Sequence, residues 1–156
     1  MTLDMWNKCI NVNLTGAFLC SKYAILNGCK RIINIGSTSS FYGRGGWSSY
    51  GVTKSALLSF TESLNDEGIK AQILCFGRTN TNLRKKLNII EDISKNLDPI
   101  IIARAIFEII TNKYDSMLIF VDKLGNITEK SKIECINLEI QKLIHSIFDF
   151  SVILPN

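Results

Sequence analysis

Residues 31–54 read R-I-I-N-I-G-S-T-S-S-F-Y-G-R-G-G-W-S-S-Y-G-V-T-K, and this stretch decides the fold. Its first six residues form a short apolar run rich in β-branched side chains, which predicts a buried strand. A loop of serine, threonine and glycine follows over residues 37–49. A helix is expected from residue 50 to about residue 67, where Gly68 provides a stop signal. The stretch therefore predicts a strand, a loop and a helix in series.

The alternation of helices and strands continues on both sides of this stretch. The other expected elements are, in order, a helix over residues 3–27, a strand over residues 72–76, a helix over residues 98–112, a strand over residues 117–121 and an amphipathic helix over residues 130–150. Strands separated by helices require right-handed crossovers and a parallel sheet. We therefore expect an α/β fold with about three strands, each buried on both faces because each is a continuous apolar run.

The composition argues against several function classes. The 156 residues are 46% hydrophobic and 21% charged, so a buried core is expected. The net charge of +4 is not arranged in a basic stripe, and His145 is the single histidine, so we expect neither nucleic-acid binding nor a metal site. No segment reaches the apolar length of a spanning helix, so no membrane segment is expected. Five scattered cysteines are typical of reduced core residues in a cytoplasmic protein.

Tyr50 and Lys54 are the first candidates for a catalytic role. They lie four residues apart at the start of a helix, so the phenol and the ammonium project from one face. Ser37 lies thirteen positions before Tyr50, directly after a strand that delivers it to the carboxyl edge of the sheet, and Asn13 lies on the preceding helix. A lone Y-x-x-x-K pair arises often by chance, as a helix-start aromatic and a solvated charge. The four residues in this order favour an acid–base site instead.

Five stretches of the chain resemble the short-chain dehydrogenase/reductase family. They are W-N-K-C-I-N-V-N-L-T-G-A-F-L-C-S-K from Trp6, R-I-I-N-I-G-S from Arg31, Y-G-V-T-K-S-A from Tyr50, D-E-G-I-K-A-Q-I-L-C-F-G-R-T-N-T from Asp66 and D-P-I-I-I-A-R-A-I from Asp98. Together they follow the second half of the family pattern. The resemblance implies a truncated, Rossmann-like three-layer sheet, with residues 1–125 as the C-terminal half of the family's domain. Residues 126–156 would form an extra C-terminal amphipathic helix and tail.

The resemblance also implies an activity, which is hydride transfer between NAD or NADP and a small-molecule carbonyl or alcohol. The family's catalytic tetrad corresponds to Asn13, Ser37, Tyr50 and Lys54. A phenol is a useful acid and base near neutral pH only beside a cation, which Lys54 supplies to Tyr50. Ser37 would donate a hydrogen bond to the substrate carbonyl. Asn13 would interrupt its helix locally and hold a water that relays protons to the lysine.

The segment after the second strand corresponds to the family's P-G-x-x-x-T sequence, which surrounds the nicotinamide. Gly77 and Thr81 match this pattern, while Phe76 replaces the usual proline. The implied cofactor-binding residues of this chain are Tyr50, Lys54, Gly77, Thr79 and Thr81.

The family's glycine-rich cofactor motifs, T-G-x-x-x-G-x-G and N-N-A-G, do not occur in these residues. Two hypotheses follow. The first is the C-terminal half of an NAD(P)-dependent oxidoreductase, as a fragment, as one member of a split pair with a separate N-terminal half, or as an independent protein. The second is a noncatalytic oligomerisation domain. The resemblance implies a cytoplasmic homo-oligomer that forms through the helices at residues 6–27 and 50–67.

Overall fold

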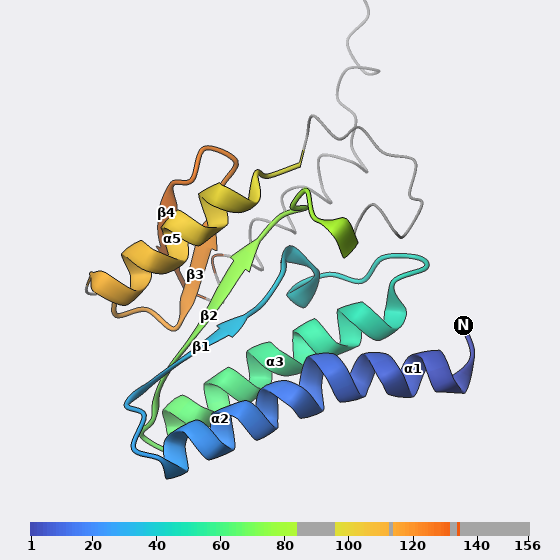
Figure 1. Ribbon diagram of the computed structural model, residues 1–156, viewed down its shortest axis with the longest axis horizontal. Coiled ribbons are helices and arrows are strands. Elements are labelled where there is room, and N and C mark those ends of the chain that lie inside the picture. The colour runs from blue at the N-terminus through green and yellow to red at the C-terminus, as the bar shows by residue number, and fades with distance from the viewer. Residues whose placement is uncertain (84–95, 113, 132–133, 135–156) are drawn as a thin grey trace, which may run out of the picture.

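The computed structural model describes residues 1–83, 96–112, 114–131 and 134 (Figure 1). The helices are α1 (Leu3–Ile10), the π-helix η1 (Asn11–Thr15), α2 (Gly16–Leu26), the 3-10 helix η2 (Thr38–Ser40), α3 (Ser48–Asp66) and α5 (Pro99–Thr111). The strands are β1 (Arg31–Ile35), β2 (Lys70–Phe76), β3 (Leu118–Val121) and β4 (Ile127–Lys130). The helices other than η2 and the first three strands confirm the elements expected for these residues, whereas η2 lies in the segment expected to be a loop.

The strands form one sheet in the order β1-β2-β3-β4. β1 and β2 pair in parallel, as do β2 and β3, whereas β3 and β4 are antiparallel. Helix α3 covers one face of the sheet and α5 the other (Figure 1). Successive residues of β2 point to opposite faces, so Ile73 packs with Leu57 of α3 and Leu74 packs with Ile109 of α5. This three-layer arrangement confirms the α/β, Rossmann-like fold class.

The fourth strand was not expected from the sequence. β4 pairs antiparallel with β3, and the turn between them is held by Asp122, whose carboxylate accepts hydrogen bonds from the backbone N–H groups of Leu124 and Asn126 at 2.8 and 2.9 Å. Gly125 lies in this turn with φ of +88°, a conformation that favours glycine. β4 belongs to the part that we assigned to the tail. The expected helix over residues 130–150 lies almost entirely outside the described residues.

Strand β1 is less buried than the sequence suggested. Ile32 and Asn34 are buried, whereas Ile33 is half-buried and Ile35 is 40% exposed. The expectation that every strand is buried on both faces is therefore wrong for β1. The physical reason is its position at the edge of the described sheet, where it pairs with β2 alone.

A second correction concerns the first helix. Among the described residues, Leu3–Leu26 is long and apolar enough to cross a membrane by length and composition, with a mean hydropathy of 1.2. The expectation that no segment meets this criterion is wrong here. One such helix is weak evidence, because core helices pass the same test. In this fold, Leu14 and Ala17 pack against the cluster that contains Leu57, and Ala24 packs against Ile32.

The cysteines are only partly in the core. None of the four described cysteines forms a disulfide. Cys75 on β2 is fully buried, and Cys9 is half-buried, but Cys20 and Cys29 are exposed. The expectation of buried cysteines is therefore wrong for these last two, and Cys135 lies outside the described residues.

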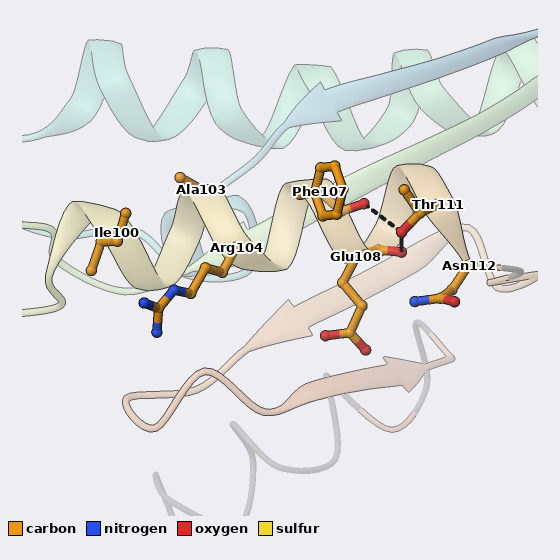
Figure 2. A pocket seen from close by; sticks show the side chains of 7 residues that line it. All are labelled: Ile100, Ala103, Arg104, Phe107, Glu108, Thr111 and Asn112. Carbon is orange, nitrogen blue, oxygen red and sulfur yellow. Dashed lines mark hydrogen bonds between the residues drawn. The ribbon is translucent and has the colours of Figure 1, made fainter.

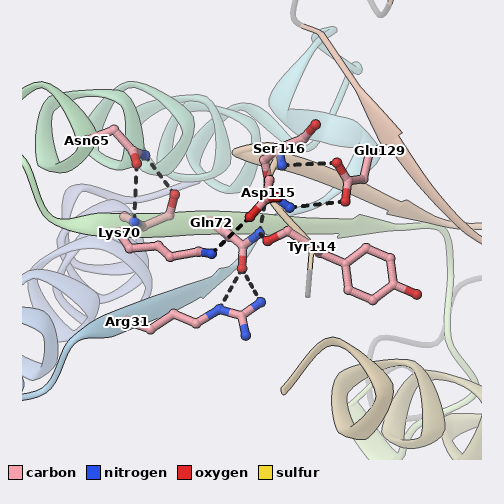
Figure 3. Close-up of polar contacts among 9 residues, drawn as sticks. Arg31, Asn65, Lys70, Gln72, Tyr114, Asp115, Ser116 and Glu129 are labelled. Atoms are coloured by element: carbon pink, nitrogen blue, oxygen red, sulfur yellow. Dashed lines mark hydrogen bonds and ion pairs between the residues drawn. The ribbon is translucent and has the colours of Figure 1, made fainter. Parts of the chain in front are cut away.

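A buried glutamine on β2 forms hydrogen bonds to β1 and to the loop before β3 at the end of the sheet where these strands begin (Figure 3). The side chain of Gln72 is 1% exposed, and its Nε2 donates to the carbonyl oxygens of Tyr114 and Ser116, each at 2.9 Å. Its Oε1 accepts a hydrogen bond from Arg31 Nε at 2.8 Å. Glu129 of β4 accepts from the backbone N–H of Ser116 at 3.0 Å. The loop that leads into β3 is thus bonded to both neighbours of β3, to β2 through Gln72 and to β4 through Glu129. It lies at the end of the sheet opposite to Ser37.

Candidate active site

Ser37 lies immediately after β1, where the chain passes very close to β2. The backbone N–H of Gly36 donates to the carbonyl oxygen of Leu74 at 2.8 Å. A Cβ atom at Gly36 would lie 2.7 Å from Cys75 Sγ and 2.8 Å from Ile73 Cγ1, so only glycine fits without movement of β2. This close approach fixes the point from which Ser37 leaves the sheet.

The Ser37 side chain caps the short helix η2. Its Oγ accepts a hydrogen bond from the backbone N–H of Ser39 at 3.1 Å. A serine hydroxyl has one hydrogen to donate and two lone pairs, so this contact leaves the hydrogen for another acceptor. Helix η2 is in turn tied to α3, because Ser55 Oγ donates to the carbonyl oxygen of Ser40 at 3.1 Å.

Tyr50 and Lys54 lie on one face of α3, as their spacing predicts. Lys54 Nζ is 5.7 Å from the centroid of the Tyr50 ring. Trp47 packs edge-on against the same ring, with 5.9 Å between centroids and 73° between planes. The phenol is therefore held between an indole and an ammonium group.

Lys54 also reaches the end of β1. Its Nζ donates to the carbonyl oxygen of Ile35 at 2.7 Å. Burial lowers the pKa of Lys54 below its usual 10.5, and the thiols of Cys75 and Cys9 act in the opposite direction. Lys54 thus connects the helix that carries Tyr50 to the strand that delivers Ser37.

Asn13 lies in η1, a π-helical segment between α1 and α2. The expectation of a local interruption at Asn13 is confirmed, because a π-turn inserts one extra residue into an otherwise regular helix. Asn13 Nδ2 lies 3.3 Å from Cys9 Sγ and 3.4 Å from Thr53 Oγ1. Asn13 therefore contacts the turn of α3 that separates Tyr50 from Lys54.

The expected nicotinamide segment follows β2 at the same carboxyl edge of the sheet (Figure 1). Gly77 and Thr81 are exposed, and Thr79 is half-buried. The segment is fastened to Leu97 through a parallel bridge at Thr79 and a 2.9 Å hydrogen bond from the Asn80 backbone N–H to the Leu97 carbonyl oxygen. The structure thus brings Lys54 beside Tyr50 and the end of β1 and places Asn13 against the same turn of α3, while Gly77, Thr79 and Thr81 lie on a separate segment.

Two residues beside this site were not anticipated, Thr53 and Cys9. Both contact Asn13. The sequence feature that could have indicated Thr53 is its position among the buried residues along one side of α3, most of which are leucines. A threonine on such a stripe needs a hydrogen-bond partner.

A hollow of about 470 Å³ lies elsewhere on the molecule (Figure 2). Its lining residues come from α5 and from the residue that caps its C-terminal end: Ile100, Ala103, Arg104, Phe107, Glu108, Thr111 and Asn112. None of them is a predicted site residue, and one helix with its cap forms the whole lining. The site therefore rests on the residues around Tyr50 and not on this hollow.

Comparison with known proteins agrees with this geometry. A family model described as short chain dehydrogenase matches residues 1–92. The chain belongs to the short-chain dehydrogenase family. The matched residues include Asn13, Ser37, Tyr50, Lys54 and the segment after β2.

The chain covers only part of the length of its individual relatives. The 3-oxoacyl-(acyl-carrier-protein) reductase FabG of Buchnera aphidicola is 36% identical over 99 residues, which are 58% of this chain and 41% of that reductase. A short-chain dehydrogenase/reductase structure from Brucella melitensis has a TM-score of 0.66 at 23% identity, and the match covers 82% of this chain and 59% of that one. ElxO, solved with NADP bound, has a TM-score of 0.65 at 23% identity, covering 79% and 58%. The structural likenesses show a shared fold, and the match spans about two fifths of the Buchnera reductase.

Proposed function

We propose that this chain carries the acid–base half of an NAD(P)-dependent oxidoreductase that acts on a small-molecule carbonyl or alcohol. It would correspond to the C-terminal half of the family's domain. The observation that carries the proposal is the position of Lys54, whose ammonium lies beside the Tyr50 ring and bonds to the end of β1, two residues before Ser37. The family match over these residues supports the same activity.

Each side chain has a task that its contacts allow. Tyr50 gives its phenolic proton to the substrate oxygen during carbonyl reduction and takes a proton during alcohol oxidation. The ammonium of Lys54 stabilises the phenolate that remains. The hydroxyl of Ser37, whose oxygen already accepts from Ser39, donates its hydrogen to the carbonyl oxygen. Asn13 keeps its helix locally open beside these groups.

The described residues fit the nicotinamide end of the cofactor. Lys54 has three N–H donors, of which Ile35 occupies one, so the others suit ribose hydroxyls. Gly77, Thr79 and Thr81 lie at the same edge of the sheet and would face the nicotinamide. When bound, the nicotinamide supplies or accepts the hydride.

The diphosphate end of the cofactor needs further residues. Phosphates bind glycine-rich turns at helix N-termini, and the family's glycine-rich motif does not occur in this sequence. We propose that an N-terminal half, in the same chain or in a separate one, supplies it and pairs along β1. The exposure of Ile35 and the edge position of β1 in the described sheet support this site of association.

Titration of the full chain with NADH and with NADPH tests the proposal. The expected result is weak but saturable quenching of protein fluorescence, because the chain holds only the nicotinamide end of the cofactor, followed by slow nicotinamide oxidation with a 3-oxoacyl thioester. The thioester is chosen because the Buchnera relative is a 3-oxoacyl reductase. Tyr50→Phe should retain cofactor binding and lower turnover by roughly 10²–10⁴-fold, the usual contribution of acid–base catalysis. Absence of saturable binding with either nucleotide would overturn catalysis by the chain alone.

A second candidate is a noncatalytic domain that self-associates in the cytoplasm through residues 6–27 and 50–67. The observation that favours it is the exposed apolar side chains on these helices: Val12, Phe18, Leu19, Tyr23, Leu26 and Val52. Such a surface is typical of an interface between subunits. Sedimentation of the wild type and of Leu19→Glu tests the interface, because an oligomer held by these side chains would dissociate in the variant. The nucleotide titration separates the two candidates, because a noncatalytic oligomer binds neither NADH nor NADPH.

A further inference from the structure

Thr53 occupies a buried position between the two residues of the acid–base pair. Its side chain is fully buried, with 0% exposure. Thr53 Oγ1 donates to the carbonyl oxygen of Tyr50 at 2.8 Å and lies 3.4 Å from Asn13 Nδ2, from which it accepts. The hydroxyl therefore joins the backbone of α3 to a side chain of another helix.

The Asn13 amide has two acceptors on two different helices. Its Nδ2 donates to Cys9 Sγ, one turn earlier in the sequence, and to Thr53 Oγ1. Asn13 belongs to the π-turn, where the regular i to i−4 bonding of the helix is interrupted. A segment with irregular bonding depends on such side-chain contacts for a defined position.

We propose that Thr53 is a positioning residue for the acid–base pair: through Asn13 it fixes the η1 turn against the part of α3 that carries Tyr50 and Lys54. The chemistry that this contact serves rests on the proposed function. The contact itself rests on the hydrogen bonds described above. Thr53 touches neither substrate nor the reacting atoms, so its effect is exerted through Asn13.

The chemistry of the site explains why a hydroxyl is needed here. The buried stripe of α3 also contains Leu57, Leu58 and Leu64, so apolar side chains fill comparable positions on the same helix. A buried hydroxyl is favourable only where its partners remain in place. Valine has nearly the shape of threonine but neither accepts from Asn13 nor donates to Tyr50.

Thr61 provides a matched control on the same helix. It too is fully buried, donates to the carbonyl oxygen of Leu57 at 2.7 Å, and accepts from the side-chain amide of Asn34 at 2.9 Å. Thr61→Val therefore removes the same kind of contact two turns away, without touching Asn13.

The test is nuclear magnetic resonance of the full chain labelled with ¹⁵N, in the variants Thr53→Val, Thr53→Ser and Thr61→Val. In Thr53→Val we expect the Asn13 side-chain amide signals to move toward those of exposed asparagines and to lose protection from hydrogen exchange. Thr53→Ser, which keeps the hydroxyl, should restore both, and Thr61→Val should leave them unchanged. Asn13 signals that stay in place in Thr53→Val, or that move equally in Thr61→Val, overturn the proposal.

This result is independent of the outcome of the nucleotide titration. The Asn13 signals report the contact with Thr53, whereas saturable binding of NADH or NADPH reports the proposed activity. If the Asn13 signals behave as expected but no nucleotide binds, the proposed activity fails. If a nucleotide binds but the Asn13 signals do not respond to Thr53→Val, the positioning role of Thr53 fails.

Discussion

Lys54 Nζ lies 2.7 Å from the carbonyl oxygen of Ile35, so the ammonium of helix α3 bonds to the last residue of strand β1. A strand at the edge of a sheet has backbone groups that face away from its neighbour, and this contact satisfies one of them. The same contact draws a charged group into a partly buried place, where burial lowers the pKa of Lys54.

The lowered pKa of Lys54 predicts how stability depends on pH. Below the folded-state pKa, Lys54 is charged in both the folded and the unfolded chain. The cost of burying its charge then lowers the free energy of unfolding by its full amount. Between that pKa and the usual 10.5, the unfolded chain binds more protons, so the free energy of unfolding rises with pH. Urea denaturation measures the free energy of unfolding of the wild type and of Lys54→Met. The value for the wild type minus the value for the variant should rise as pH increases toward about 10. A difference that stays constant over this range contradicts the prediction.

The close approach at Gly36 predicts a destabilising substitution. In Gly36→Ala the new Cβ would meet Cys75 Sγ at 2.7 Å, so the free energy of unfolding should fall by about 1–3 kcal/mol, as for other overpacked sites. Gly43→Ala is the control, because a Cβ there meets nothing within 4 Å and should change the stability by less than about 0.5 kcal/mol. Urea denaturation measures both, and equal changes in the two variants would count against the packing explanation.

The buried pair Asn34 and Thr61 should act as one unit. Thr61→Val leaves the amide of Asn34 without its acceptor at 2.9 Å and should destabilise by about 1–3 kcal/mol. Asn34→Leu should have a similar effect, but the double variant should lose less than the sum of the two. Thermal and urea denaturation of the four proteins give the coupling energy. Strict additivity would mean that the two side chains do not stabilise each other.

Asp98 should stabilise the start of α5. Its Oδ1 accepts from the backbone N–H of Ile100 at 2.9 Å, and Pro99 occupies the first turn. Asp98→Ala should therefore lower the free energy of unfolding by about 1 kcal/mol, whereas Asp98→Asn, which keeps an acceptor oxygen, should lower it much less. Denaturation followed by circular dichroism tests this, and equal losses in both variants would exclude capping as the cause.

The sequence was most informative where local pattern decides the structure. The apolar runs at β1, β2 and β3 and the cap at Asp98 predict their elements directly, whereas the interruption of the first helix at Asn13 was implied by the family resemblance. β4 was missed because four residues, I-T-E-K, carry too little pattern to be distinguished from a loop. Its pairing with β3 is a tertiary effect.

Within the site, spacing along one helix was enough to place Tyr50 beside Lys54. The contacts of Thr53 and the bond from Lys54 to Ile35 could not be foreseen, because they depend on how α3 lies against η1 and β1. Sequence spacing does not fix the distance between two such elements. The exposure of Ile35 likewise depends on β1 being an edge strand.

The contact between β1 and β2 at Gly36 has a consequence for how related sequences can vary. Because a Cβ at residue 36 would lie only 2.7 Å from Cys75 Sγ, the size of a side chain on β2 limits how closely the chain before Ser37 can approach the sheet. A larger residue at position 75 would displace the serine hydroxyl without any change in the serine itself. Homologues that enlarge residue 75 should therefore carry a compensating change nearby, so that positions 36, 73 and 75 covary as a group.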